Sequence, residues 1–270
     1  MTDRYAVIGN PIAHSKSPVI HAAFARQTGQ DLSYEAILAP LGGFAEAVRE
    51  FRAAGGKGMN VTVPFKVEAW QTAGQLSERA RLAQAVNTLK FEEDGGILGD
   101  NTDGAGLVRD ISRNLDCPLE GKAILLMGAG GAARGVLLPL LEQRPASLYI
   151  VNRTAAKARE LQGAFSAHGR VEAGGYPDLS GRRFDVIVNA TSSGLADELP
   201  PLPPGIFAPG ALAYDMMYGR ETPFMAFARA HGASVVADGL GMLVEQAAES
   251  FFLWRGVRPE AAPVIRQLRA

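Results

Sequence analysis

The feature that most constrains the fold is a glycine-rich turn that joins an apolar strand to a helix near the middle of the chain. Residues 123–127 form a short apolar run typical of a buried parallel strand. The run ends in Gly128-Ala-Gly-Gly-Ala-Ala133, a G-x-G-x-x-A form of the dinucleotide-binding turn. Gly128 permits the tight turn, Gly130 lets backbone approach a pyrophosphate, and Ala133 lets the helix pack on the strand. The sequence therefore predicts a dinucleotide-binding fold that starts well inside the chain.

Strand and helix signals alternate on both sides of this turn. Ser17 and Pro18 mark a helix start, as N-cap and first helical residue. Residues 200–210, rich in proline and glycine, predict a surface loop, and residues 240–254 a last helix with one apolar face. The strands that we expect lie at 5–8, 34–38, 58–63, 85–91, 123–127, 148–151, 185–188, 212–214 and 234–236. This alternation predicts an α/β fold with parallel or mostly parallel sheets.

Composition narrows the class of protein. An apolar content of 47% with 20% charged residues is typical of a soluble globular enzyme. The formal net charge of −1 provides no basic field, which argues against nucleic acid and anionic membranes as partners. The single cysteine, Cys117, excludes an internal disulfide and fits a reducing compartment. Because neither a hydrophobic leader nor an apolar run of about 18 residues is present, we expect a cytoplasmic protein.

The end of the second strand of the nucleotide fold indicates which cofactor is bound. Asn152-Arg153-Thr154 follows the strand at 148–151, where an NAD enzyme would offer an acidic residue to the ribose hydroxyls. An arginine with polar neighbours suits a 2′-phosphate instead, which favours NADP. The alternative is an exposed arginine at a strand end.

Polar side chains also gather where strands of the first segment end, which is where open α/β sheets bind ligands. They stand in four groups: Ser15-Lys-Ser17, Asn60-Val-Thr-Val-Pro-Phe-Lys66, Asn87-Thr88 and Asp100-Asn-Thr-Asp103-Gly-Ala-Gly106. Structural alternatives stay open for each group. Ser17 and Asp103 could each cap a helix. Asn87 could serve a turn, and Lys66 could be a solvated lysine. Gln246, beside the apolar stripe of the last helix, is by default a surface amide.

Metal-dependent and hydrolytic chemistry are disfavoured. The four histidines show no ligand spacing, and no carboxylate joins them. The G-x-S-x-G elbow of serine hydrolases does not occur. A reaction without a metal ion is therefore favoured.

Taken in order along the chain, the motifs resemble those of the shikimate dehydrogenase family. They are His14-Ser-Lys-Ser-Pro18, Asn60-Val-Thr-Val-Pro-Phe-Lys66, Ala85-Val-Asn-Thr88, Gly99-Asp-Asn-Thr-Asp-Gly104, Gly128-Ala-Gly-Gly-Ala132, Asn152-Arg-Thr154, Asn189-Ala-Thr191 and Asp238-Gly-Leu-Gly-Met-Leu243. The resemblance covers nearly the whole chain. It implies an α/β substrate domain of residues 1–105 completed by the C-terminal segment 240–270, and a Rossmann-like NADP-binding domain of residues 106–239. It also implies NADPH-linked reduction of 3-dehydroshikimate to shikimate in aromatic amino-acid biosynthesis.

The resemblance further assigns roles to single positions. Lys66 and Asp103 match the catalytic pair of the family. The substrate-binding positions are Ser15 and Ser17 for the carboxylate, Thr62, Asn87, Asp103 and Gln246 for the hydroxyls, and Tyr218 at the pocket. The cofactor-binding positions are Glu78, Gly128, Ala129, Gly130, Gly131, Ala132, Asn152, Arg153, Thr154, Lys157, Thr191, Met216 and Gly239. No metal site is expected, and both a monomer and a homodimer stay open.

Three alternative functions are weighed against this interpretation. A sibling enzyme that accepts quinate and uses NAD is disfavoured by Arg153-Thr154, because no acidic residue stands there. A non-catalytic NADP-binding regulator on the same fold would not need a proton donor, so Lys66 and Asp103 argue against it. A reductase for a different small metabolite is the third alternative.

Overall fold

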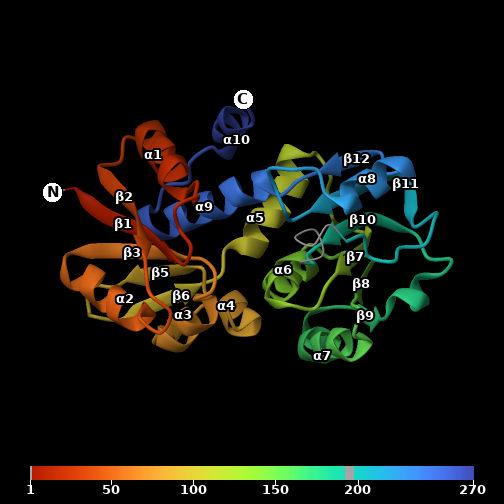
Figure 1. Cartoon of the computed structure of the whole chain (residues 1–270), viewed down its shortest axis with the longest axis horizontal. Coiled ribbons are helices and arrows are strands. Elements are labelled where there is room, and N and C mark those ends of the chain that lie inside the picture. The colour runs from red at the N-terminus through yellow and green to blue at the C-terminus, as the bar shows by residue number, and fades with distance from the viewer. Residues whose placement is uncertain (1, 192–197) are drawn as a thin grey trace. The chain divides into compact units, whose positions relative to one another are not determined.

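The computed structural model describes residues 2–191 and 198–270, which form two compact units. The first unit consists of Met1–Gly106 and Leu243–Ala270, and the second of Leu107–Met242. Each unit contains a six-stranded sheet (Figure 1). The chain leaves the first unit within α5 (Asp103–Arg109) and returns to it within α9 (Leu240–Arg255), so these two helices belong to both units.

The sheet of the first unit is mixed. Its strand order is β2-β1-β3-β5-β6-β4, and β5 runs antiparallel to both of its neighbours while the other pairs are parallel. The antiparallel pair arises because only a short Gly95-Gly96 turn joins β5 to β6, and a parallel pair would need a long crossover. The strands are β1 (Asp3–Gly9), β2 (Leu32–Leu38), β3 (Gly56–Val61), β4 (Gln75–Leu76), β5 (Thr88–Phe91) and β6 (Ile97–Asp100).

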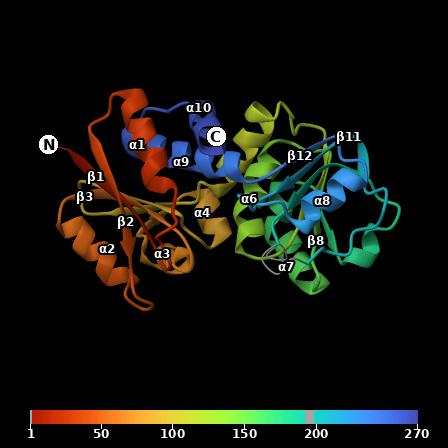
Figure 2. The same ribbon diagram turned by 45° about the horizontal axis from the view of Figure 1, so that its top comes forward.

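Helices cover both faces of this sheet (Figures 1 and 2). On one face lie α1 (Ser17–Thr28), α9 and α10 (Ala261–Arg269), which share an apolar core that includes Phe24, Val244 and Phe251. On the other face, α2 (Phe44–Ala53) and α3 (Lys66–Thr72) pack against β1 and β3, and α4 (Glu78–Ala83) joins the same core through Ala80. Because helices cover both faces, the ends of the strands are where ligands can reach the sheet.

The second unit has the strand order of a Rossmann fold. All its strands are parallel, in the order β9-β8-β7-β10-β11-β12, which corresponds to 3-2-1-4-5-6. α6 and α7 lie on one side of the sheet and α8 on the other (Figure 1). The elements are β7 (Ala123–Met127), α6 (Gly131–Glu142), β8 (Ser147–Val151), α7 (Ala155–Phe165), β9 (Val171–Gly174), β10 (Phe184–Asn189), β11 (Phe207–Asp215), α8 (Pro223–Ala230) and β12 (Val235–Ala237). The switch point where the strand order reverses lies between β7 and β10.

Two details of the sequence prediction are wrong. Ser17 is the first residue of α1, and Lys16 occupies the N-cap position without a side-chain cap, so Ser17 does not cap this helix. The predicted loop over residues 200–210 ends early, because β11 already begins at Phe207. Ile206 and Phe207 are buried in the core of the second unit, and that burial draws the backbone into the sheet despite Pro209 and Gly210.

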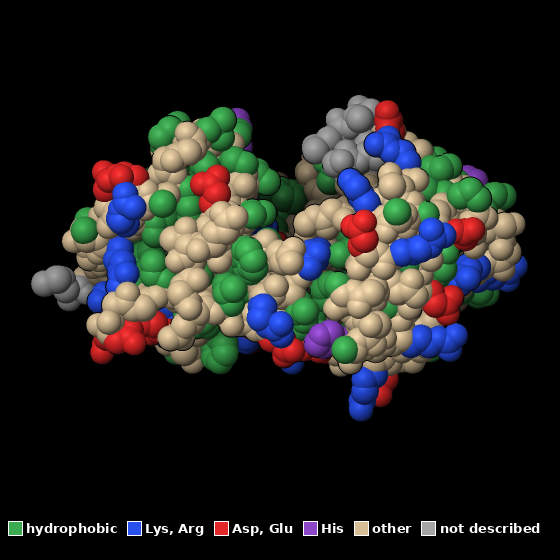
Figure 3. All heavy atoms as spheres, turned by 90° about the horizontal axis from the view of Figure 1, so that it is seen from below, with side chains coloured by type: hydrophobic (Ala, Val, Ile, Leu, Met, Phe, Trp, Pro, Cys, Tyr) green, Lys and Arg blue, Asp and Glu red, His purple; other side chains and the backbone are tan. Residues whose placement is uncertain are grey.

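The surface carries charges of both signs. On the face drawn in Figure 3, lysine and arginine side chains alternate with aspartate and glutamate side chains. This pattern agrees with the formal net charge of −1. Among the helices of the described ranges, none is long and apolar enough to cross a membrane.

Candidate active site

A lysine and an aspartate form an ion pair at the carboxyl edge of the first sheet. Lys66 is the first residue of α3, and Asp103 is the first residue of α5. The Lys66 Nζ lies 2.5 Å from Asp103 Oδ2, and the two side chains are 30% and 18% exposed. Phe65, fully buried against Phe44, anchors the backbone just before the lysine. Lys66 is therefore not a solvated surface lysine, and Asp103 does more than begin a helix.

Asn87 holds the other side of this aspartate. Its Nδ2 donates to Asp103 Oδ1 at 2.8 Å and to Thr102 Oγ1 at 2.9 Å. Its Oδ1 accepts the Thr102 backbone N–H at 2.9 Å, which fixes the orientation of the amide because an N–H can only donate. Both Asp103 oxygens are thus engaged, one by an ammonium and one by an amide. Asn87 is not a turn residue. Thr102 stood in the predicted polar group of residues 100–106 but was assigned no role.

Gln246 joins this cluster from a distant part of the chain. It lies on α9, and its Oε1 accepts a hydrogen bond from Asn87 Nδ2 at 3.3 Å. Its Nε2 donates to the Leu243 carbonyl at 2.8 Å. The side chain is half-buried, so it is not an exposed flanking amide. We call Lys66, Asn87, Thr102, Asp103 and Gln246 the substrate-side cluster.

Hydroxyl groups follow the neighbouring strands at the same edge of the sheet. Ser15 and Ser17 come after β1, and the Ser17 backbone N–H donates to Ser15 Oγ at 3.3 Å. Ser17 is buried. Thr62 comes directly after β3 and accepts the Phe65 N–H on its carbonyl at 3.0 Å. Because β1 and β3 are parallel neighbours, these hydroxyls lie at the edge that carries Lys66.

A buried polar layer supports this edge. Asn60 on β3 accepts the Tyr34 hydroxyl on its Oδ1 at 2.7 Å, and His21 Nε2 lies 3.1 Å from the same oxygen. The Asn60 Nδ2 donates to Ser250 Oγ at 3.0 Å. Burial lowers the pKa of His21 to about 3, so the ring is neutral at physiological pH. A neutral ring facing an oxygen acceptor must carry its proton on Nε2, which makes His21 a donor to Asn60.

The second unit has a pocket of about 590 Å³ at its switch point. Its walls include the turn Gly128–Ala132 after β7, Asn152 and Arg153 after β8, Tyr176 after β9, and Thr191 after β10. These are the carboxyl ends of the four strands on either side of the reversal, where Rossmann folds bind dinucleotides.

The glycine turn fits a pyrophosphate. Gly128 has φ +108°, a value that side-chain-bearing residues rarely adopt, and an added Cβ would lie 3.0 Å from the Ala190 carbonyl oxygen. A Cβ at Gly130 or Gly131 would meet open space, and both glycines line the pocket at the start of α6. The positive end of this helix favours an anionic group there.

The nucleotide pocket also carries donors for a further anion. Within the described ranges Arg153 forms no ion pair, and Tyr176 beside it forms no hydrogen bond through its hydroxyl. Burial raises the pKa of Tyr176 to about 12, although the charge of Arg153 acts in the opposite direction. A guanidinium and a phenol that have no acceptor among the described residues suit a phosphate monoester. Tyr176 was not among the predicted site residues, because no local signal links it to Arg153.

The other predicted cofactor positions, apart from Glu78, lie in the second unit. Thr154 and Lys157 continue from Arg153 into α7, and the Thr191 hydroxyl donates to Asn189 Oδ1 at 2.7 Å. Met216 and Gly239 approach closely, since a Cβ on Gly239 would lie 2.2 Å from the Met216 carbonyl oxygen.

Tyr218 and Glu78 differ from the rest of their predicted sets. Tyr218, predicted to bind substrate, is in the second unit, whereas the other predicted substrate ligands are in the first. Glu78 is in the first unit, 3.8 Å from Arg81, and does not line the nucleotide pocket. Their contacts with ligands stay predictions.

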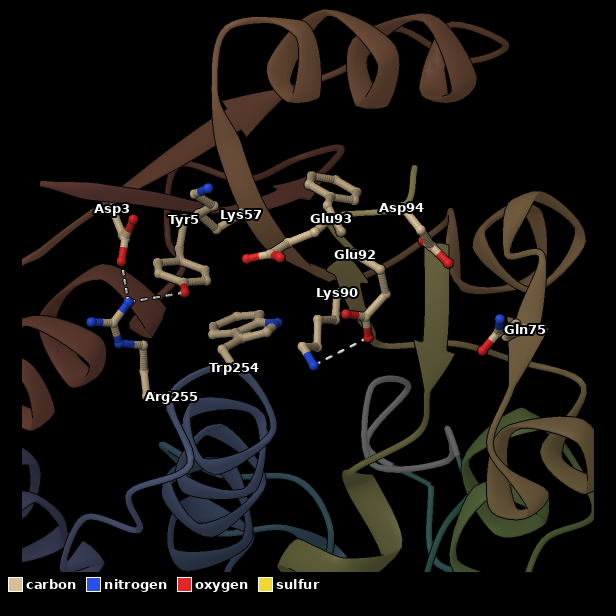
Figure 4. A pocket seen from close by; sticks show the side chains of 11 residues that line it. Asp3, Tyr5, Lys57, Gln75, Lys90, Glu92, Glu93, Asp94, Trp254 and Arg255 are labelled. Carbon is tan, nitrogen blue, oxygen red and sulfur yellow. Dashed lines mark hydrogen bonds and ion pairs between the residues drawn. The ribbon is translucent and has the colours of Figure 1, made fainter. Parts of the chain in front are cut away.

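Another concavity lies at the opposite edge of the first sheet (Figure 4). It surrounds Tyr5 and Trp254, whose rings stack 4.7 Å apart, near the amino-terminal ends of β1 and β3. Four of its charged side chains form ion pairs, since Lys90 contacts Glu92 at 3.1 Å and Arg255 contacts Asp3. None of the predicted site residues lines it. The substrate-side cluster and the nucleotide pocket are therefore the candidate sites.

Comparison with known proteins identifies matches along the chain. A family model for the shikimate dehydrogenase substrate binding domain matches residues 7–89. A model for shikimate/quinate 5-dehydrogenase matches residues 110–196, and one for the shikimate 5′-dehydrogenase C-terminal domain matches residues 239–269. The chain is 65% identical to a shikimate dehydrogenase (NADP(+)) of Aromatoleum aromaticum, over 99% of this chain and 97% of that protein.

Solved structures show the same similarity. An Ael1 enzyme from Pseudomonas putida superposes with a TM-score of 0.95 at 52% identity, covering 99% of this chain and 98% of that one. A shikimate 5-dehydrogenase from Thermus thermophilus, in complex with NADP(H) and shikimate, superposes with a TM-score of 0.86 at 34% identity. In that comparison 99% of each chain is covered.

Proposed function

The chain belongs to the shikimate dehydrogenase family, and we propose that it catalyses the reversible reduction of 3-dehydroshikimate to shikimate with NADPH. This reaction belongs to aromatic amino-acid biosynthesis. The observation that carries the proposal is the contact of 2.5 Å between Lys66 Nζ and Asp103 Oδ2, held from the other side by Asn87. A regulator that only senses NADP has no use for such a pair.

The residues of the substrate-side cluster suit a ketone reduction. NADPH, when bound, supplies the hydride. Negative charge then develops on the former ketone oxygen, and the Lys66 ammonium can stabilise it and donate the proton. Asp103 keeps that ammonium in place, while Asn87 prevents the carboxylate from rotating. In the reverse direction Lys66 accepts the proton of the substrate hydroxyl. Because its side chain is 30% exposed, it can exchange that proton with solvent.

The remaining predicted ligands are proposed to bind different groups of the substrate. We assign the carboxylate to Ser15 and Ser17, and the hydroxyls to Thr62, Asn87, Asp103 and Gln246, with Tyr218 as a further contact. Hydroxyl and amide groups suit these tasks, because they can donate to a carboxylate and can both donate to and accept from an alcohol. The first unit is thus proposed as the substrate domain.

The second unit is proposed as the NADP-binding domain. The pyrophosphate would lie on the glycine turn at the start of α6, and Arg153 would hold the 2′-phosphate with support from Asn152, Thr154 and Lys157. Arg153, which follows β8, has no acidic partner in the described ranges, and this supports NADP over NAD. Thr191, Met216, Gly239 and Glu78 complete the proposed set of cofactor contacts.

The cellular setting belongs to the proposal as well. We place the enzyme in the cytoplasm as a monomer or homodimer that acts on a small molecule without nucleic acid or membrane. The free thiol of Cys117 and the net charge of −1 support this setting. Light scattering coupled to gel filtration distinguishes monomer from dimer.

The test of the proposed activity is an initial-rate assay that follows NADP reduction at 340 nm. Purified protein is supplied with shikimate or quinate and with NADP or NAD, in all four combinations. We expect shikimate with NADP to give by far the highest kcat/KM. Comparable rates with quinate and NAD would favour the relaxed sibling enzyme. Tight NADP binding without turnover of either acid would favour the regulator.

A further inference from the structure

Arg79 on α4 binds the carboxylate of Asp100, the last residue of β6, which stands three residues before Asp103. Its Nε donates to Asp100 Oδ1 at 2.7 Å, and its Nη2 donates to Asp100 Oδ2 at 2.5 Å. This is a bidentate pair, the geometry that gives an arginine and a carboxylate the most fixed relative orientation. Asp100 is 3% exposed, and the Arg79 side chain is 24% exposed. The pair is thus largely shielded from water.

The electrostatics of the pair favour the charged forms. Burial by itself would raise the pKa of Asp100, but the hydrogen bonds and charge of Arg79 outweigh burial and lower it. Burial likewise disfavours a charged guanidinium, yet Asp100 and Glu249 raise the pKa of Arg79 overall. Each partner therefore keeps the other ionised at physiological pH.

Asp100 is joined to the catalytic aspartate by a short hydrogen-bonded turn. Its Oδ1 also accepts the Asn101 backbone N–H at 2.8 Å. Asn101 in turn accepts the Asp103 N–H on its Oδ1 at 3.2 Å and donates through Nδ2 to the Ala85 carbonyl at 3.1 Å. The position of Asp103 thus follows from the position of Asp100.

Arg79 also holds the helix that supplies Gln246. Its Nη2 donates to Glu249 Oε1 at 3.1 Å, and Glu249 stands three residues after Gln246 on α9. Residues three apart lie on neighbouring positions of one helix face. Glu249 Oε2 accepts from Arg258 Nη2 at 2.5 Å. A single guanidinium therefore ties α4, the turn before Asp103, and the helix that carries Gln246.

We propose that Arg79 is a positioning residue for the reaction, which sets the place of the Asp103 carboxylate against Lys66 by holding Asp100 and Glu249. This inference rests on the proposed function of the Lys66 and Asp103 pair. Its consequence is specific: loss of the bidentate contact displaces the proton-transfer pair, while the serines that hold the substrate carboxylate stay in place. Turnover is therefore affected more than substrate affinity.

The test compares Arg79→Lys with Arg258→Lys. Both replacements keep a positive charge next to Glu249, but only the first removes the planar fork on Asp100. For Arg79→Lys we expect kcat to fall about 10- to 100-fold, the range that a small misplacement of reacting groups produces, with the KM for shikimate within about threefold. For Arg258→Lys we expect kcat within about threefold of the parent protein. Urea unfolding of both variants, with rates measured well below the transition, keeps folding losses separate.

Chemical rescue supplies a second readout. Arg79→Ala is assayed with and without millimolar guanidinium, which can occupy the vacated site on Asp100 and should restore part of kcat, whereas methylammonium should not. Arg79→Gln passes through the same assays, so that the result does not depend on one variant folding. Unchanged kcat in folded Arg79 variants, or equal losses at Arg79 and Arg258, would overturn the inference. Absence of shikimate oxidation by the parent protein would instead overturn the proposed function.

Discussion

Lowering the pH should destabilise the protein through His21, which lies beneath the substrate-side cluster. The side chain is 0% exposed and stacks on Tyr34 with ring centroids 4.2 Å apart. Phe24, Phe251 and Trp254 surround the ring, and its one polar contact with the described residues is Asn60 Oδ1. Because no charged side chain of residues 2–191 and 198–270 stands among the groups that act on His21, a protonated ring there would be desolvated without compensation.

The lowered pKa of His21 determines both the sign and the size of the change in the free energy of unfolding. Burial lowers the pKa of His21 from 6.5 to about 3, so between these values the unfolded chain binds a proton that the folded chain does not. The free energy of unfolding must therefore fall as the pH falls below 6.5, by about 1.4 kcal/mol per pH unit. Between pH 6.5 and 5 the loss is about 2 kcal/mol, and near pH 3 it is on the order of 5 kcal/mol. Above pH 7 the contribution is constant.

Urea unfolding followed by circular dichroism at pH 5, 5.5, 6, 6.5 and 7.5 measures this slope. His21→Phe keeps an aromatic ring in the stack but has no proton to bind. We expect this variant to be less stable at pH 7.5 by about 1 kcal/mol, because it loses the hydrogen bond to Asn60, but to have a much flatter slope below pH 6.5. The exposed His231→Gln variant should keep the parent slope. If His21→Phe also keeps the parent slope, His21 is not the group responsible and the reasoning fails.

Three further predictions concern the catalytic and cofactor residues. Lys66→Ala should lower kcat about 10²- to 10⁴-fold, with a smaller change in shikimate affinity. The double variant with Asp103→Asn should have a kcat scarcely lower than that of the poorer single variant. If Lys66→Ala lost affinity alone, Lys66 would be only a binding residue. Arg153→Ala should raise the KM for NADP about 10- to 100-fold and that for NAD far less, and equal losses would show that Arg153 does not contact the 2′-phosphate. Gly128→Ala should destabilise the fold by about 1–3 kcal/mol in thermal unfolding, because it must adopt φ +108° against the Ala190 carbonyl oxygen. Gly131→Ala, which meets open space, should unfold as the parent does but bind NADP more weakly in a fluorescence titration, and the opposite ranking of the two glycines would contradict this account.

Local signals were sufficient to predict the nucleotide fold. The apolar strand, the glycine turn and the helix of residues 123–142 are contiguous, and each depends on the backbone preferences of its own residues. The same holds for Arg153, which is readable because it follows the next strand in sequence. The mixed character of the first sheet was less readable, because the direction of β5 depends on pairing with β3 and β6.

The sequence by itself determined which residue types stand at the strand ends, and the family resemblance suggested their roles. Only the tertiary structure decided which of them meet. Lys66 and Asp103, Asn87 and Gln246, and Arg79 and Glu249 are far apart along the chain, and their contacts of 2.5, 3.3 and 3.1 Å exist because the sheet and α9 bring them together. Tyr176 joined Arg153 in one pocket for the same reason, since it follows a different strand. The sequence around a polar residue does not show which partner its side chain meets. Burial and neighbouring side chains decide whether that residue is solvated or paired, and both are properties of the folded chain.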